Sequence, residues 1–208
     1  MPAALRGRYR LGPGIARLAQ GASRELVHLL HPALDALSHQ IGETTDLAEF
    51  QQTTVNFIDQ VVAPNMLLAV SGVGRSFPLH STCVGKAALA QLTPERARRL
   101  LPRTLPAFTP NTVTRRDELE RQVAEARRTG YAWDNEEHTL GITAVATSFT
   151  TPGRTVVTLS IPMPTARAES HGPELVEALL ATRDDMVALL ARQRLAVGEM
   201  DDAAYLGA

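Results

Sequence analysis

The chain has 208 residues, of which 44% are hydrophobic and 21% are charged, so it can bury a large core without a metal or a disulfide. Its 21 basic and 22 acidic residues leave a formal net charge of −1, which excludes a basic surface for nucleic acid over the whole chain. The single cysteine, Cys83, excludes an internal disulfide and fits a reducing compartment. No apolar run approaches the roughly 18 residues of a membrane helix, and the basic start is not followed by a signal-peptide core. We therefore expect a cytoplasmic protein with no membrane partner, no metal and no cofactor.

Two helices are expected before residue 42. Pro13 can occupy the first turn of a short helix, which Gly21 should stop. Ser23 is predicted to cap a second, longer helix, in which leucines recur at three- and four-residue spacing on one face. Pro32 should kink this helix, and Gly42 should end it.

Strands are expected next. β-Branched and apolar residues predict three of them, over residues 45–50, 55–62 and 66–70. Residues 51–54 are typical of a hairpin loop between the first two. Residues 71–79 contain two glycines and a proline, so a loop is expected there.

Three helices are predicted in the middle of the chain. The first should begin at a cap in residues 81–82, and the second should span residues 93–101. Thr114 and Asp117 have the three-residue spacing of a capping box, so a third helix is expected from there to a C-terminal cap at Gly130.

The last part of the chain predicts strands over residues 131–133, 142–150 and 155–161. A final helix is expected over residues 173–193, with a frayed tail after residue 197. Antiparallel hairpins with helices grouped to one side predict an α+β fold.

Four segments carry a family resemblance. They are Tyr9-Arg10-Leu11-Gly12, Gly42-Glu43-Thr44, residues 78–87 (PLHSTCVGKA) and residues 130–141 (GYAWDNEEHTLG). In this order and with this spacing they resemble the IclR family of bacterial transcriptional regulators, over about residues 8–193. The first segment is similar to the junction between that family's winged-helix DNA-binding domain and its linker helix.

The resemblance implies a GAF-like effector-binding domain, with a curved antiparallel sheet, helices on its faces and a pocket on one side. It divides the chain into the end of a wing (1–12), a linker helix (13–22), the effector-binding domain (23–196) and a flexible tail (197–208). Most of the winged helix-turn-helix would then be missing. We favour truncation over a stand-alone GAF-like sensor, because residues 9–12 make little sense without a preceding wing.

The resemblance also implies partners. Family members sense small metabolites, often carboxylic acids, and bind operator DNA through the N-terminal domain that is missing here. They form homodimers or homotetramers, and both states remain open for this chain.

A helix start suggests how such an acid would be bound. The first amides of a helix lack internal partners and carry the positive end of its dipole, so they bind anions. The small side chains in this segment would let a ligand approach the backbone. Candidate donors to a ligand carboxylate are the N–H groups of Thr82, Cys83, Val84 and Gly85.

The resemblance implies effector contacts beyond this helix as well. They are expected at Cys83, Val84, Asp134, Ile142, Ala144 and Ser160. Ile142 and Ala144 are two residues apart, so they share one face of a strand and would form an apolar wall. Ser160 would supply a hydroxyl, and Asp134 could accept a hydrogen bond from a ligand hydroxyl.

One position departs from the family pattern. Pro162 stands where some relatives carry a serine, which removes a hydroxyl and an N–H donor. With Met163 and Trp133 expected nearby, the ligand should be bulkier and more apolar than a two- or three-carbon acid. We therefore expect an aromatic or longer-chain carboxylate.

Other chemistries fit these residues less well. Cys83 and His80 superficially suggest a nucleophile and a base, but they are three residues apart and no orienting acid is evident, so an enzyme is not expected. Cys83 is more typical of a small buried residue than of a redox sensor. Asp134, Glu136 and His138 alternate like metal ligands, but an acidic run before a turn is usually solvated or capping.

Overall fold

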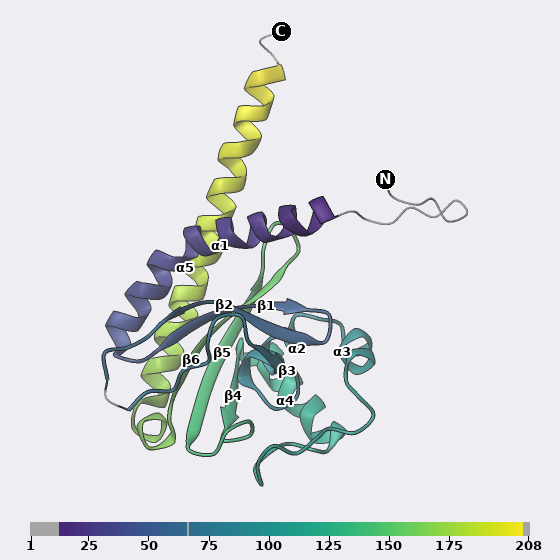
Figure 1. Cartoon of the computed structure of the whole chain (residues 1–208), viewed down its shortest axis with the longest axis vertical. Coiled ribbons are helices and arrows are strands. Elements are labelled where there is room, and N and C mark those ends of the chain that lie inside the picture. The colour runs from purple at the N-terminus through teal and green to yellow at the C-terminus, as the bar shows by residue number, and fades with distance from the viewer. Residues whose placement is uncertain (1–12, 66, 206–208) are drawn as a thin grey trace, which may run out of the picture.

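The structure is a computed structural model that describes residues 13–65 and 67–205, with side chains from residue 23 to residue 193 except those of residues 66 and 169. Residues 9–12, which resemble the end of a wing, lie outside this range. Within the described residues, six strands form an antiparallel sheet in the order β3-β2-β1-β6-β5-β4, with helices on both faces (Figure 1). The predicted α+β fold is confirmed. The elements are α1 (Pro13–Ile41), β1 (Thr45–Gln51), β2 (Thr54–Val61), β3 (Ser76–Pro78), α2 (Cys83–Ala90), α3 (Pro94–Leu100), α4 (Arg116–Thr129), β4 (Tyr131–Asn135), β5 (Ile142–Thr150), β6 (Val156–Pro164) and α5 (Thr165–Tyr205).

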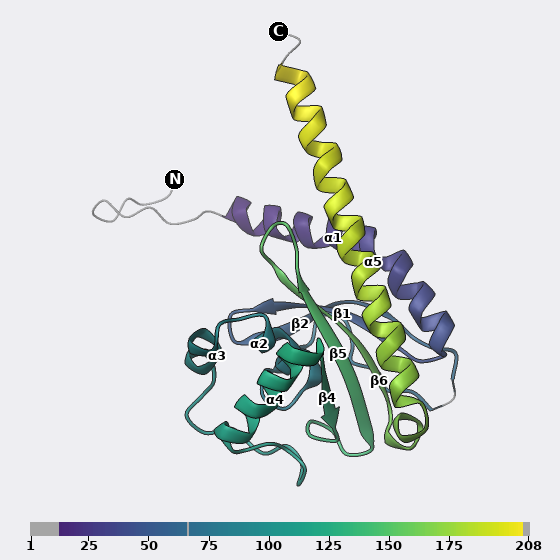
Figure 2. The same ribbon diagram turned by 180° about the vertical axis from the view of Figure 1, so that it is seen from behind.

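The sheet separates two hydrophobic cores. Helices α1 and α5 pack together on one face, and α2 and α4 pack on the other, as the opposite views of Figures 1 and 2 show. Successive side chains of a strand point to opposite faces. In β6, Ile161 and Met163 are fully buried in the core with α1 and α5, whereas Ser160 and Pro162 face the α2 side.

One continuous helix replaces the two helices predicted before residue 42. α1 passes through Gly21 and Pro32 without a break, and the predicted boundary between residues 22 and 23 lies inside it. Packing outweighs the low helix propensity of glycine and proline, because three leucines of the predicted stripe are buried against α5 and the sheet. They are Leu30, Leu34 and Leu37. Gly42 ends the helix as predicted, with a left-handed φ of 67°.

The prediction of a third strand over residues 66–70 is wrong. Residues 67–70 form no strand, residue 66 lies outside the described range, and β3 instead lies within the predicted loop. Gly72 and Gly74, before β3, adopt φ of 85° and 86°. The Phe57 N–H of β2 donates to the Arg75 carbonyl at 3.0 Å, and the Gly74 N–H donates to the Phe57 carbonyl at 2.8 Å. These turns align β3 with β2. One edge of β2 pairs with β1 and the other pairs with β3, so residues 67–70 cannot pair with β2.

The helices around the middle of the chain begin largely as predicted. Thr82 caps α2 and Thr93 caps α3. The predicted capping box of α4 is wrong, because that helix begins after Arg115 and no side chain caps it. Arg115 Nε donates to the Asp117 carboxylate at 3.1 Å, which engages the side chain that the box would have used.

The last helix is longer than predicted. α5 begins at Thr165, directly after β6, and Pro173 lies inside it rather than at its start. The Thr165 N–H donates to the Gly141 carbonyl at 3.0 Å, which fixes this turn into the helix. The backbone stays helical to Tyr205, through most of the tail predicted to be flexible. No helix in residues 13–65 and 67–205 combines the length and the hydropathy needed to cross a bilayer.

Candidate functional site

A cavity of about 310 Å³ lies on the α2 side of the sheet, between the start of α2 and strands β4, β5 and β6. Sequence reasoning placed residues from all four of these elements at one site, and the fold brings most of them together. Those that line the cavity are Thr82, Cys83, Val84, Asp134, Ile142, Ala144 and Ser160. Their contact with a ligand stays a prediction.

The start of α2 adjoins the cavity with two backbone donors. The Thr82 side chain accepts a hydrogen bond from Gly85 N at 3.1 Å, and its carbonyl accepts one from Lys86 N at 3.0 Å. Among the described residues, no oxygen accepts a hydrogen bond from the amides of Cys83 and Val84, and the Val84 N–H lies beside the Cys83 thiol. Both residues line the cavity, so the positive end of the helix dipole adjoins it.

Gly85 does not contribute as predicted, because the helix cap already occupies its amide. A Cβ at this position would overlap the backbone of Leu79. Gly85 therefore allows α2 to pack closely against the preceding segment and offers no donor to a ligand.

Trp133 and Met163 lie on the wrong face of the sheet for the predicted site. Met163 is fully buried in the core with α1 and α5, and the Trp133 ring lies beside Gly172 of α5. The two-residue period of a strand requires this, since the neighbouring Asp134 and Pro162 face the cavity. Of the residues used to predict a bulky apolar ligand, only Pro162 lines the cavity.

Asp134 is the buried carboxyl group of the cavity. It is 7% exposed, and its Oδ1 accepts hydrogen bonds from Glu137 N at 2.7 Å and from His138 N at 3.4 Å. Burial raises the pKa of Asp134 to about 7, and the charge of Glu137 acts in the same direction. The nearby Lys86 ammonium lowers the pKa but does not offset burial.

A buried ion pair joins α2 to the turn that follows β4. Lys86 of α2 contacts Glu137, and their side chains are 1% and 6% exposed. The Lys86 Nζ also donates to Gln122 Oε1 of α4 at 2.9 Å. Glu137 Oε2 is fully enclosed and has no hydrogen-bond partner among the described residues. The pair fixes α2 against the turn after β4, whose amides bind Asp134.

Aromatic and loop residues that sequence reasoning missed complete the cavity. The His138 ring lies between Phe77, at a centroid distance of 4.8 Å, and Phe108, at 4.9 Å. Burial lowers the pKa of His138, so its imidazole is neutral at neutral pH. Phe57 and the exposed Arg75 also line the cavity. The alternation of β2 could have placed Phe57, but no local pattern marks the loop residues.

The outer wall is the segment of residues 68–71. Its Ser71 hydroxyl donates to Asp46 Oδ2 at 2.6 Å, and burial raises the pKa of Asp46 to about 6. Behind the segment, Arg167 of α5 binds Glu43 through two nitrogens and donates to the Leu67 carbonyl at 3.0 Å. Glu43, which follows Gly42 after the end of α1, thus anchors the wall of the cavity.

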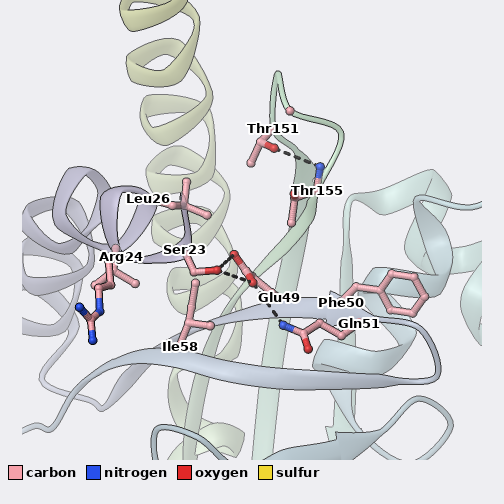
Figure 3. Close-up of a pocket in the computed structure, with 11 residues that line it drawn as sticks. Ser23, Arg24, Leu26, Glu49, Phe50, Gln51, Ile58, Thr151 and Thr155 are labelled. Carbon is pink, nitrogen blue, oxygen red and sulfur yellow. Dashed lines mark hydrogen bonds between the residues drawn. The ribbon is translucent and has the colours of Figure 1, made fainter. Parts of the chain in front are cut away.

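A second, more open hollow of about 880 Å³ lies between α1, the end of β1, Ile58 of β2 and the turn between β5 and β6 (Figure 3). The Ser23 hydroxyl donates to both oxygens of Glu49, at 3.2 and 3.1 Å. Ser23 was predicted to cap a helix, but it lies inside α1 and contacts the sheet instead. Gln51 Nε2 donates to the same carboxylate at 3.5 Å, so Glu49 is already bonded on several sides.

Across the described residues, no group of three or more His, Cys, Asp or Glu side chains is placed to hold a metal ion. Asp134 Oδ1 instead accepts from the amides of the turn that follows β4, and Glu136 is half-buried in that turn.

Known proteins resemble the chain in sequence and in fold. Residues 20–188 match the family described as Bacterial transcriptional regulator IclR C-terminal. The chain is 43% identical over 176 residues to the HTH-type transcriptional regulator Rv1719 of Mycobacterium tuberculosis, which covers 85% of this chain and 68% of that protein. The crystal structure of the Thermotoga maritima IclR has a TM-score of 0.76 at 26% identity, over 88% of this chain and 76% of that one. An IclR homologue from Microbacterium hydrocarbonoxydans, complexed with 4-hydroxybenzoate, has a TM-score of 0.76 at 24% identity, over 91% of this chain and 78% of that one.

Proposed function

This chain belongs to the IclR family of bacterial transcriptional regulators, as the effector-binding C-terminal domain, and from that premise we propose that it binds a small carboxylate in the cavity beside α2. Its relatives are transcriptional regulators rather than enzymes. Binding would control attachment to operator DNA by a winged helix-turn-helix located N-terminal to this domain in the cytoplasmic full-length protein.

The amides of Cys83 and Val84, which donate to no oxygen among the described residues, carry this proposal. A helix start that adjoins a cavity attracts a carboxylate, because its N–H groups and its dipole both favour negative charge. The Ser160 hydroxyl is 2% exposed, lines the cavity and makes no hydrogen bond among the described residues. It therefore offers a further polar contact to a ligand.

The rest of the cavity favours an aromatic or longer-chain acid. Its volume is at the lower end of the roughly 300–1,000 Å³ of small-molecule pockets. Phe57, Phe77 and Pro162 supply apolar surface to the cavity. The 4-hydroxybenzoate bound by the Microbacterium homologue is a ligand of this class and is a reasonable member of a test panel.

Assembly with a second copy is part of the proposal. The C-terminal part of α5 projects away from the sheet and offers a surface to another subunit (Figure 1). We expect a homodimer or homotetramer, which sedimentation velocity would distinguish. A monomer at all concentrations would contradict this part alone.

Thermal unfolding against a panel of acids tests the binding proposal. The panel contains glyoxylate, pyruvate, octanoate, benzoate, 4-hydroxybenzoate and phenylacetate. An acid at about 100 times its Kd should add about 2.7 kcal/mol, or roughly 5–10 °C in Tm for a domain of this size. A panel without any shift would contradict carboxylate sensing.

A pair of variants tests the amides directly. Cys83→Pro removes one amide donor at the first helical position, where proline is tolerated. The extended conformation of Thr82, with φ −133° and ψ 147°, suits a residue before proline. Cys83→Ala removes the thiol and keeps the amide, so it is the matched control. Only the proline variant should lose affinity strongly.

A further inference from the structure

We propose that Asp134 makes the cavity selective for an anionic ligand: as a carboxylic acid it donates a hydrogen bond to the bound carboxylate, so above neutral pH one proton binds together with each ligand. The proton comes from solvent and joins the Asp134 carboxyl group, and no bond of the ligand is made or broken. This inference rests on the proposed carboxylate site.

The placement of the two Asp134 oxygens supports this role. The amides of Glu137 and His138 occupy Oδ1. Among the described residues, no hydrogen bond reaches Oδ2, although the side chain is buried and lines the cavity. The carboxyl group also lies close enough to α2 for its charge to raise the pKa of the Cys83 thiol. Asp134 therefore has one free oxygen beside the amides expected to bind the ligand.

The surrounding charges do not balance an ionised Asp134 and a bound anion together. On α2 the Lys86 ammonium is engaged by Glu137 and by Gln122 of α4. The turn after β4 adds the Glu137 carboxylate and the neutral His138 ring. The remaining charged groups near the cavity are the Asp46 carboxyl group of β1 and the Arg75 guanidinium before β3. Strands β5 and β6 line the cavity with uncharged residues only.

Arg75 does not replace the missing counter-charge. Its guanidinium is exposed and lies over the Phe77 ring at 5.2 Å, so water weakens its charge, which acts on the His138 ring rather than on Asp134. An anion at the α2 amides would therefore face a second, uncompensated negative charge if Asp134 were ionised. A proton on Asp134 removes this repulsion and creates an O–H donor.

The intrinsic acidity of the site supports the same conclusion. Burial raises the pKa of Asp134 to about 7, so a proton is available to this group near neutral pH. A neutral carboxylic acid donates to an oxygen acceptor. A ligand carboxylate should consequently bind more tightly than the matching primary amide, whose NH₂ group would face the same donor.

The experiment compares benzoate with benzamide, and 4-hydroxybenzoate with 4-hydroxybenzamide, between about pH 6 and pH 9. Ligand carboxylates titrate near pH 4 and stay ionised over this range. The Kd of an acid should be constant below about pH 7 and should rise about tenfold per pH unit above it. Calorimetry in buffers of different ionisation enthalpy should show uptake of close to one proton above pH 7.

Two variants isolate the titrating group. Asp134→Asn keeps an acceptor for the turn amides but cannot titrate, so its Kd for the acids should not depend on pH. His138→Gln is the matched control, because it removes a nearby titratable side chain that also lines the cavity and should retain the wild-type slope. If Asp134→Asn misfolds, the ¹³C signal of the Asp134 carboxyl in the wild-type protein gives its ionisation directly.

The outcomes separate the two proposals. If no panel acid binds even at about pH 6, the carboxylate site itself is refuted, and this inference falls with it. If an acid binds with the same Kd across the range, or if the Asp134 carboxyl is ionised in the complex, only the role of Asp134 is overturned.

Discussion

Replacing Lys86 by methionine should destabilise the fold strongly. Met has a similar length, so the volume stays filled, but the buried Glu137 carboxylate loses its cation. Leaving one member of a buried pair uncompensated costs about 3–5 kcal/mol. A domain of this size has a total stability of about 5–15 kcal/mol, so the variant should still fold at low temperature.

Urea unfolding followed by circular dichroism measures this effect, with a lower midpoint and an unchanged m-value expected for Lys86→Met. The double variant Lys86→Met/Glu137→Leu should recover most of the loss, because an apolar replacement of a buried pair is often neutral. Arg98→Met is the matched control. It breaks the exposed Arg98–Glu120 pair and should leave the urea midpoint almost unchanged, because water screens exposed charges. A loss of that small size for Lys86→Met, or no recovery in the double variant, would refute the reasoning.

Three further predictions concern residues around the cavity, namely Gly85, Asp134 and Arg167. Gly85→Ala should cost about 1–3 kcal/mol or more in a urea titration, because the new Cβ overlaps the fixed Leu79 backbone; wild-type stability would contradict this packing. Asp134 loses its proton near pH 4 in the unfolded chain but only near pH 7 in the folded state. The free energy of unfolding should therefore fall by roughly 2–4 kcal/mol as the pH rises from about 4 to about 7. Asp134→Asn should lose that part of the slope in urea midpoints, and an unchanged slope would exclude the shift. Arg167→Gln should speed hydrogen exchange in residues 67–71, because it removes contacts worth about 1–3 kcal/mol. Arg167→Lys should speed it less. Equal exchange rates in the wild type and both variants would show that other contacts hold the segment.

The strand faces show what the sequence could predict. The two-residue period placed Ile142 and Ala144 on one face of β5, and both line the cavity. The same period, applied to Asp134, would have placed Trp133 on the opposite face. The error came from judging Trp133 and Met163 by their nearness in sequence rather than by their position in the strand.

The outer wall shows what the sequence could not predict. Residues 66–70 have strand-like composition, but the available edge of β2 is occupied by β3. The ties of the wall to Glu43 and Arg167 join positions distant in sequence, so no local pattern reveals them. The contact of Ser23 with Glu49 could not be predicted either, because Ser23 lies inside the continuous helix α1 rather than at a helix start.

Strand β6 is a single polypeptide layer shared by two interiors. Ser160 and Pro162 border the cavity, while Ile161 and Met163 are embedded between the sheet and the outer helices. A displacement of the strand on the cavity side must therefore move its buried side chains on the other side. Close-packed interiors resist compression and answer such a displacement by repacking. A displacement of β6 at the cavity would thus be transmitted through the sheet. It would reach α1 and α5, which do not contact the cavity.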